Sequence, residues 1–205
     1  MAPPRLPKRE RTRRTLIDAG LQVLADRGDA LTASDVVAVA EVSNGTFYNH
    51  FTDRQAFLDA LAHESLIALT RGSADDTEGS DPAWRFAVAS TRVLVTAQRE
   101  PLWGHAVLRL AEIPAPPHQA IQTHLRADLA EGHTAGRFGH GDDTVTIDLV
   151  TGTIMATLRR LVAEPGHGDS IAAVVARLLV AVGIDPSEAH TLAATALETE
   201  LATRN

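Results

Sequence analysis

Apolar residues recur every three or four positions along most of the chain, which is the spacing of an amphipathic helix. In the segment 10–26 they form one stripe that ends before Gly28, a typical helix stop. No run alternates apolar and polar residues over a useful strand length, so the sequence predicts an all-α protein of nine or ten helices. The remaining long helical patterns cover residues 53–71, 81–100, 102–112, 118–131, 143–164, 170–183 and 186–201.

Two short helices joined by a three-residue turn are predicted between residues 32 and 51. Thr32 is a candidate N-cap for the first, and Ser43 can cap the second, which opens at Asn44. Two helices so close in sequence are typical of a helix-turn-helix. Directly afterwards, TDRQ at residues 52–55 has the pattern of a capping box and predicts the start of a fourth helix.

The helix opened at Asn44 is expected to have two different faces. Phe47 and Phe51 fall on one side, where they can anchor the helix, while Gly45 and Asn49 fall opposite. Small and hydrogen-bonding groups on an outer face let a helix enter a DNA groove and reach base edges or phosphates. The pattern therefore indicates nucleic-acid recognition.

Composition and charge restrict the classes of function. The chain has 205 residues, is 44% hydrophobic and has no Cys, which removes disulfides, thiolate metal sites and Cys nucleophiles. Its net charge is −7, but residues 5–14 are strongly basic, with Glu10 as their one acid, and a polyanion responds to such a local patch.

Neither an enzyme nor a cofactor is predicted, because the sequence has no glycine-rich phosphate loop and no nucleophile elbow. No metal site is predicted either. The loop that contains His133, His140, Asp142 and Asp143 is interpreted as a polar connection ending in a helix N-cap. A membrane span and a secretory signal are not recognisable, so the expected location is the cytoplasm.

The segment Leu31 to Leu61, LTASDVVAVAEVSNGTFYNHFTDRQAFLDAL, resembles the helix-turn-helix of the TetR family, the tetracycline-repressor-like transcriptional regulators. The sequence departs from the family pattern at two positions. Glu41 stands in the turn where the family usually has Gly, and Arg54 stands where it usually has Lys. The resemblance implies a sequence-specific repressor that binds an inverted-repeat operator in double-stranded DNA. A ligand-independent regulator or an activator is the alternative, and an all-α enzyme is much less favoured.

Roles in DNA binding follow from the resemblance together with the outer face of the third helix. Base contacts are assigned to the first residues of that helix and to the side-chain amide of Asn49. Phosphate contacts are assigned to polar groups around the helix, and the basic segment Arg9 to Arg14 adds positive charge. The expected base contacts are Asn44, Gly45, Thr46 and Asn49, and the expected phosphate contacts are Thr32, Ser43, Tyr48, His50 and Arg54.

The segment 144–164 is apolar around most of its circumference, and 171–182 is rich in Leu, Val and Ile. One subunit is not expected to bury both segments completely, so a homodimer is predicted, with a monomer core as the alternative. The resemblance implies a four-helix interface from this pair. The expected interface residues are Ile154, Leu158, Leu161, Val174, Leu178 and Val182.

The resemblance also implies a pocket for a small organic effector within residues 81–164. The helical face shared by His105 and Arg109 suits a carboxylate, although a solvated face is the simpler interpretation. We therefore expect residues 1–52 to form the DNA-binding domain and residues 53–205 the effector-binding and dimerisation domain. The expected ligand contacts are Phe86, Trp103, His105, Arg109, His118, Gln122, Thr151 and Met155.

Overall fold

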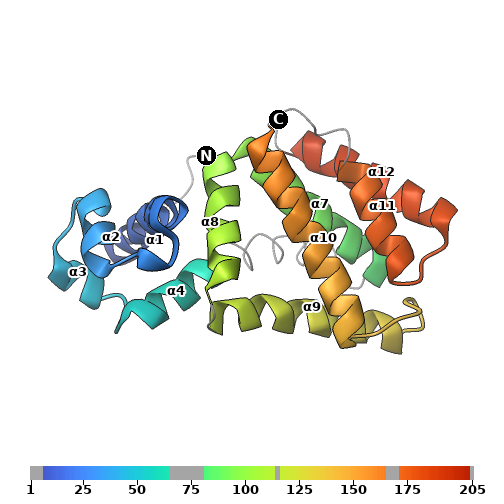
Figure 1. Cartoon of the computed structure of the whole chain (residues 1–205), viewed down its shortest axis with the longest axis horizontal. Coiled ribbons are helices and arrows are strands. Elements are labelled where there is room, and N and C mark those ends of the chain that lie inside the picture. Colours follow the sequence, from blue (N-terminus) through green and yellow to red (C-terminus); the bar gives the residue numbers. More distant parts are fainter. Residues whose placement is uncertain (1–6, 65–80, 114–115, 165–170, 204–205) are drawn as a thin grey trace.

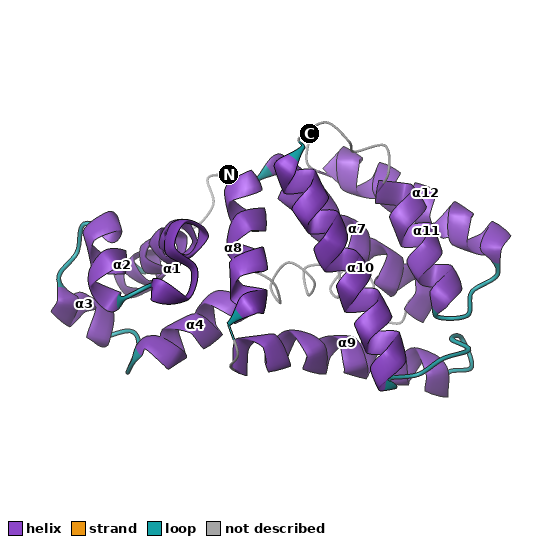
Figure 2. Cartoon of the chain, in the orientation of Figure 1, coloured by secondary structure: helices purple, strands orange, loops and turns teal. Residues whose placement is uncertain are grey.

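The computed structural model describes residues 7–64, 81–113, 116–164 and 171–203, and every regular element in them is helical (Figures 1 and 2). The prediction of an all-α fold with nine or ten helices is confirmed. The elements are α1 (Lys8–Arg27), the 3-10 turn η1 (Gly28–Ala30), α2 (Ala33–Ala40), α3 (Asn44–Tyr48), α4 (Arg54–Ala62), α7 (Pro82–Arg99), α8 (Pro101–Glu112), α9 (Pro116–Thr134), α10 (Thr144–Ala163), α11 (Ile171–Ala181) and α12 (Pro186–Thr203).

Helices α1 to α4 form an N-terminal unit around a cluster of phenylalanine rings. Phe47 and Phe57 are fully buried, with ring centroids 5.1 Å apart, and Phe51 lies 4.8 Å from Phe57. Gly20 of α1 lets the Phe57 ring approach closely, because a Cβ there would stand 2.4 Å from the ring's Cζ atom. The aromatic residues thus fix the short α3 against longer helices, since a helix of this length is not stable alone.

The C-terminal unit is built around α7, which packs against α8, α9, α10, α11 and α12. Its Ala87 and Leu94 have no exposed surface. An ion pair between the half-buried Arg92 and the buried Glu200 joins it to α12, where the Arg92 Nε atom donates to Glu200 at 2.6 Å. Burial of a charge requires such a partner, so the pair fixes how α12 lies on α7.

Helix α8 belongs to both units and stands between them in Figure 1. Ala106, Leu110 and Ile113, on its side toward α1, join the core of the N-terminal unit. Trp103 and Val107 join the core around α7. A displacement of α8 therefore has to disturb packing in the N-terminal unit.

Two details of the N-terminal unit differ from the sequence-based expectation. The N-cap of α4 is Asp53, whose carboxylate accepts from the Ala56 amide at 2.8 Å, so the capping box predicted at residues 52–55, with Thr52 in the N-cap position, was wrong. Phe57 and Leu61 of α4 also lie in the same core as α1. The domain boundary expected at residue 52 stays a prediction, and this packing favours a boundary after Ala62.

Most residues predicted at the dimer interface lie inside the protomer. Leu158, Leu161 and Val182 have no exposed surface and Leu178 has 1%, because α10 and α11 pack on α7. The protomer therefore covers these four residues by itself, whereas Val145 and Leu149 of the same apolar segment stay exposed, and the dimer interface stays a prediction. Of the predicted set, only Ile154 and Val174 are partly exposed.

No helix in the described part of the chain is long and apolar enough to cross a membrane.

Candidate functional site

The start of α2 is fixed by a reciprocal cap between Thr32 and Asp35. The Asp35 amide donates to Thr32 Oγ1 at 3.3 Å, and the Thr32 amide and hydroxyl donate to the Asp35 carboxylate at 3.1 and 2.6 Å. The hydrogen bond from the Thr32 side chain is the main reason why the pKa of Asp35 lies below its usual value. Thr32 is the N-cap that the sequence predicts.

Helix α3 shows the two faces expected from its sequence. Phe47 is fully buried, whereas Asn44, Gly45 and Asn49 are exposed and Tyr48 is 58% exposed. The outer face of α3 is therefore accessible at the protein surface.

The N-cap of α3 is Ser43, which accepts from the Thr46 amide at 3.2 Å, as the sequence predicts. The Ser43 and Thr46 hydroxyls also lie 2.9 Å apart. Both side chains thus have partners inside the protein, although Ser43 remains exposed. Their contacts with DNA stay predictions.

The turn between α2 and α3 is left-handed at Glu41, with φ 54° and ψ 42°. Among the described residues, Glu41 is the only non-glycine residue with positive φ. This conformation explains the usual glycine at this position, because a Cβ makes the left-handed region unfavourable. The exposed Glu41 carboxylate also adds a negative charge at the surface beside α3.

Arg54 does not have the free guanidinium expected of a phosphate contact. Its Nε donates to the Leu31 carbonyl at 2.9 Å, and its Nη2 lies 2.7 Å from both the carbonyl and the carboxylate oxygen of Asp29. These bonds hold the start of α4 against the turn before α2. Arg54 therefore positions α4 within the N-terminal unit, and its contact with a phosphate stays a prediction.

His50 lies beside the beginning of α1, where a cavity of about 340 Å³ is lined by Pro7, Arg9, Glu10, Arg13 and His50. Burial, followed by the positive charges of Arg9 and Arg13, holds the pKa of His50 below its usual value. Helix α1 begins at Lys8, so the basic segment Arg9 to Arg14 is helical.

Arg13 is engaged within the protein. Its Nε donates to Glu64 at 2.8 Å, and its guanidinium lies 4.7 Å from the centre of the Phe51 ring. Arg13 therefore fastens α1 to the segments on either side of α4, and Arg9 is the cation of this cavity that faces solvent.

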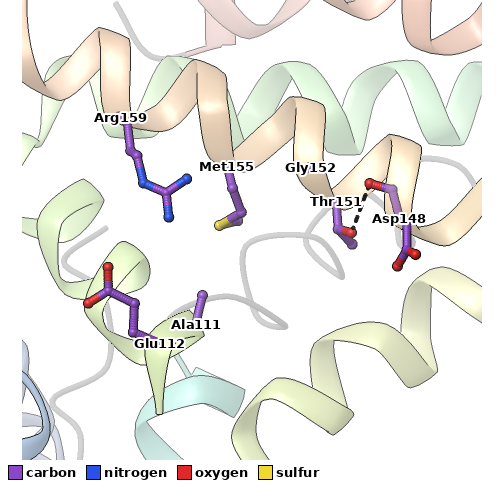
Figure 3. A pocket seen from close by; sticks show the side chains of 7 residues that line it. All are labelled: Ala111, Glu112, Asp148, Thr151, Gly152, Met155 and Arg159. Carbon is purple, nitrogen blue, oxygen red and sulfur yellow. Dashed lines mark hydrogen bonds between the residues drawn. The ribbon is translucent and has the colours of Figure 1, made fainter. Parts of the chain in front are cut away.

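A second cavity, of about 370 Å³, lies between the end of α8 and one face of α10 (Figure 3). Thr151 and Met155, both predicted as ligand contacts, line it. The other lining residues are Ala111, Glu112, Asp148, Gly152 and Arg159. We refer to this cavity as the α8–α10 groove.

The structure places other predicted ligand contacts outside this groove. Trp103 is core, and Phe86 packs edge-on against Phe138 with centroids 6.0 Å apart. His105 is exposed, and Arg109 packs against Gly28. The predicted side chains of His118 and Gln122 lie outside the described part of the structure.

The comparisons with known proteins assign both halves of the chain. Residues 16–61 match the model of the bacterial regulatory proteins of the tetR family, and residues 81–195 match the tetracyclin repressor-like C-terminal domain. The second match alone covers more than half of the chain. The chain belongs to the TetR family. This places it among transcriptional regulators and not among enzymes.

Individual TetR-family relatives are similar over different parts of the chain. The HTH-type transcriptional repressor DhaR of Mycobacterium sp. (strain GP1) is 40% identical over 60 residues, 29% of this chain and 30% of DhaR. The repressor LfrR of Mycolicibacterium smegmatis is 40% identical over 87 residues, 40% of this chain and 44% of LfrR. These alignments span less than half of either relative. The structure of RolR in complex with resorcinol is 26% identical, with a TM-score of 0.62, and the match covers 91% of this chain and 94% of RolR.

Five groove residues of this TetR-family chain were not predicted as ligand contacts: Ala111, Glu112, Asp148, Gly152 and Arg159. A signal for the last three was present, since they share one face of α10 with Thr151 and Met155 at helical spacing. Because most residues of the segment 144–164 are apolar, this polar face was not recognised in the sequence.

The polar loop after α9 has a structural role. Asp143 caps α10 by accepting from the amides of Val145 and Thr146 at 3.0 and 3.1 Å. His133 Nδ1 lies 3.2 Å from the Phe138 carbonyl. In the described segments, no three His, Asp or Glu residues are grouped as a metal site requires.

Proposed function

We propose that this protein is a ligand-responsive repressor that binds an inverted-repeat operator as a homodimer in the cytoplasm. The observation that carries the proposal is the outer face of α3, where Asn44, Gly45, Tyr48 and Asn49 are exposed while Phe47 is fully buried. The names of the relatives DhaR and LfrR, both repressors, support the same function.

The exposed groups of α3 suit the major groove. Asn49 and Asn44 carry amides that can pair with base edges, and Gly45 lets the backbone approach the DNA. Tyr48 has a hydroxyl for a phosphate oxygen and an apolar ring for the rim of the groove. In this assignment Asn49 contributes to sequence selection and Tyr48 to general affinity.

A dimer interface is proposed on the outer face of α10 and α11. Val145 is 74% exposed, Leu149 45% and Val180 40%. Ala156 is exposed two turns beyond Leu149 on the same face of α10. Exposed aliphatic and small residues on two contacting helices support a four-helix interface with a second copy. A symmetric dimer requires a symmetric operator.

Helix α8 supports ligand control of DNA binding. Its Ala111 and Glu112 line the α8–α10 groove, while the neighbouring Leu110 and Ile113 belong to the core of the N-terminal unit. A ligand that favours one position of α8 would therefore favour one position of the N-terminal unit. A ligand acts as a switch only through such a difference in affinity between two states.

Selection from a random DNA pool with the full-length protein tests the proposal. The recovered sequence should be an inverted repeat whose half-site centres lie roughly one helical turn, about 10 base pairs, or slightly more apart. Asn49→Ala should cost about 1–3 kcal/mol on this DNA and little on a scrambled duplex. Gln22→Ala, which removes an exposed amide from α1, is the matched control. Equal losses on both duplexes would contradict base recognition by Asn49.

A further inference from the structure

One end of the α8–α10 groove contains a charged side chain with an ion-pair partner, Glu112, and one without a partner among the described residues, Arg159. Glu112 is held by Arg109, whose Nη1 donates to its carboxylate at 3.2 Å. Arg159 lines the same end of the groove and forms no ion pair or hydrogen bond with any residue that the structure describes. Figure 3 shows its guanidinium extending from α10 into the groove, on the same side as Met155. Among the described residues, this cation of the groove therefore has no counter-ion.

The middle of the groove is apolar. Met155 lies one helical turn from Arg159, and Ala111 faces it from α8. Gly152 leaves open space beside Met155, because a Cβ there would have no neighbour within 4 Å. A flexible Met beside an open position adapts to apolar groups of different shapes.

The far end of the groove accepts hydrogen bonds. The Thr151 hydroxyl donates to the Ile147 carbonyl at 2.7 Å, so its oxygen remains free to accept from a ligand. The Asp148 carboxylate lines the same end. Asp148 is separated from Arg159 by three turns of α10, about 16 Å along the axis at 1.5 Å per residue. The acidic and basic ends of the groove are thus well separated.

We propose that the α8–α10 groove binds a small organic carboxylate, with Arg159 as the partner of its acid group and Met155 and Ala111 in contact with its apolar body. A hydrogen-bond donor at the opposite end of the ligand contacts Thr151 or Asp148. Arg suits this role because its planar fork matches the geometry of a carboxylate. A cavity of about 370 Å³ is at the small end of the range for organic ligands. The inference rests on the proposed function, since this ligand is the effector of the regulator.

The binding test uses titration calorimetry on the full-length protein with benzoate, 4-hydroxybenzoate, 3-(4-hydroxyphenyl)propanoate and decanoate, each compared with its uncharged amide. At least one acid should bind at least tenfold more tightly than its amide. Arg159→Met should remove this preference, and Arg159→Lys should retain part of it. Arg99→Met is the matched control, because Arg99 is also an exposed arginine but lies at the end of α7, outside the groove.

A second measurement separates this inference from the proposed function. The operator affinity of each unliganded variant should equal that of the wild type, and the bound acid should weaken it in the wild type and in Arg99→Met only. The proposed carboxylate site is contradicted if no acid binds. It is also contradicted if acid and amide bind equally well to the wild type and to Arg159→Met. Both conclusions hold even when operator binding is intact. Failure to select any operator would instead contradict the proposed function.

Discussion

The guanidinium of Arg54 and the residue Asp29 are joined twice, since Arg54 Nη2 lies 2.7 Å from the Asp29 carbonyl oxygen and 2.7 Å from its carboxylate. Arg54 is at the start of α4, where the helix macrodipole disfavours a cation. The acceptors of the turn before α2 compensate for this unfavourable position within the protein itself.

Arg54→Met should therefore destabilise the protein. Hydrogen bonds to a charged donor contribute roughly 1.5–3 kcal/mol each when shielded, and partial exposure of Arg54 reduces this to about 1–2 kcal/mol in total. Urea denaturation checks the value. Asp29→Asn, which keeps the carbonyl acceptor, should cost less. A fully stable Arg54→Met protein with a salt slope of DNA binding reduced by about one unit would restore the phosphate role.

Two substitutions of Glu41 separate the effect of its left-handed backbone conformation from the effect of its negative charge. Glu41→Gly removes the unfavourable left-handed Cβ, which costs about 1–2 kcal/mol, but adds about 0.4–1 kcal/mol of unfolded-chain entropy. The net result should be a stabilisation of about 0.5–1 kcal/mol, measured by urea denaturation.

Glu41→Gln keeps the strain and removes the charge. Its stability should be nearly that of the wild type, whereas its affinity for operator and random DNA should rise together, because a carboxylate near phosphates is repulsive. Fluorescence anisotropy at two salt concentrations measures this. Unchanged affinity would place Glu41 away from the DNA backbone.

His50 should make both stability and DNA binding depend on pH. Its pKa in the folded protein is below the unfolded value, so the unfolded chain binds more protons as the pH falls below about 6.5. Stability contributed by neutral His50 is therefore complete above pH 6.5 and is lost as the pH falls through the folded pKa.

DNA phosphate beside His50 should oppose the effect of Arg9 and Arg13 and favour the imidazolium, so operator binding takes up a proton and tightens from pH 8 to pH 6. His50→Gln removes both dependences if this assignment holds. Measurements of unfolding and of operator affinity at several pH values check it, and an unchanged pH profile in the variant would assign the effect to another histidine.

Leu149 should contribute to the dimer interface. A charged substitution at Leu158 would not test the interface, because Leu158 is buried in the protomer and the substitution would disrupt its core. Leu149→Glu is expected to give folded monomers by light scattering and to abolish tight operator binding. Leu102→Glu is the matched control, since Leu102 is 48% exposed on α8 and Leu149 is 45% exposed. A dimeric Leu149→Glu protein would place the interface elsewhere.

Local features were predictable from the sequence, and the contacts between distant segments were not. The caps at Thr32 and Ser43 depend on residues three positions away, so a short pattern is sufficient to predict them. The partner of Arg54 is 25 residues away, and nothing in the sequence identifies it.

Hydrophobicity has the same limitation. It showed that Leu158 and Leu178 are buried but could not show whether their own subunit or a second copy covers them. In the structure, α7 and its neighbours cover them. The groove between Glu112 and Arg159 also depends on how α8 and α10 meet, which no local pattern determines.

Helix α8 contributes side chains to two cores, and this limits how the DNA-binding segments of such regulators can be exchanged. A chimera that joins a foreign DNA-binding segment to this chain after Ala62 would keep Ala106, Leu110 and Ile113 as the surface that receives it. The incoming segment must fit those three side chains as well as its own interior. Grafts that also exchange this side of α8 should retain ligand control, whereas grafts at the chain boundary alone should fold with a loosely attached DNA-binding segment.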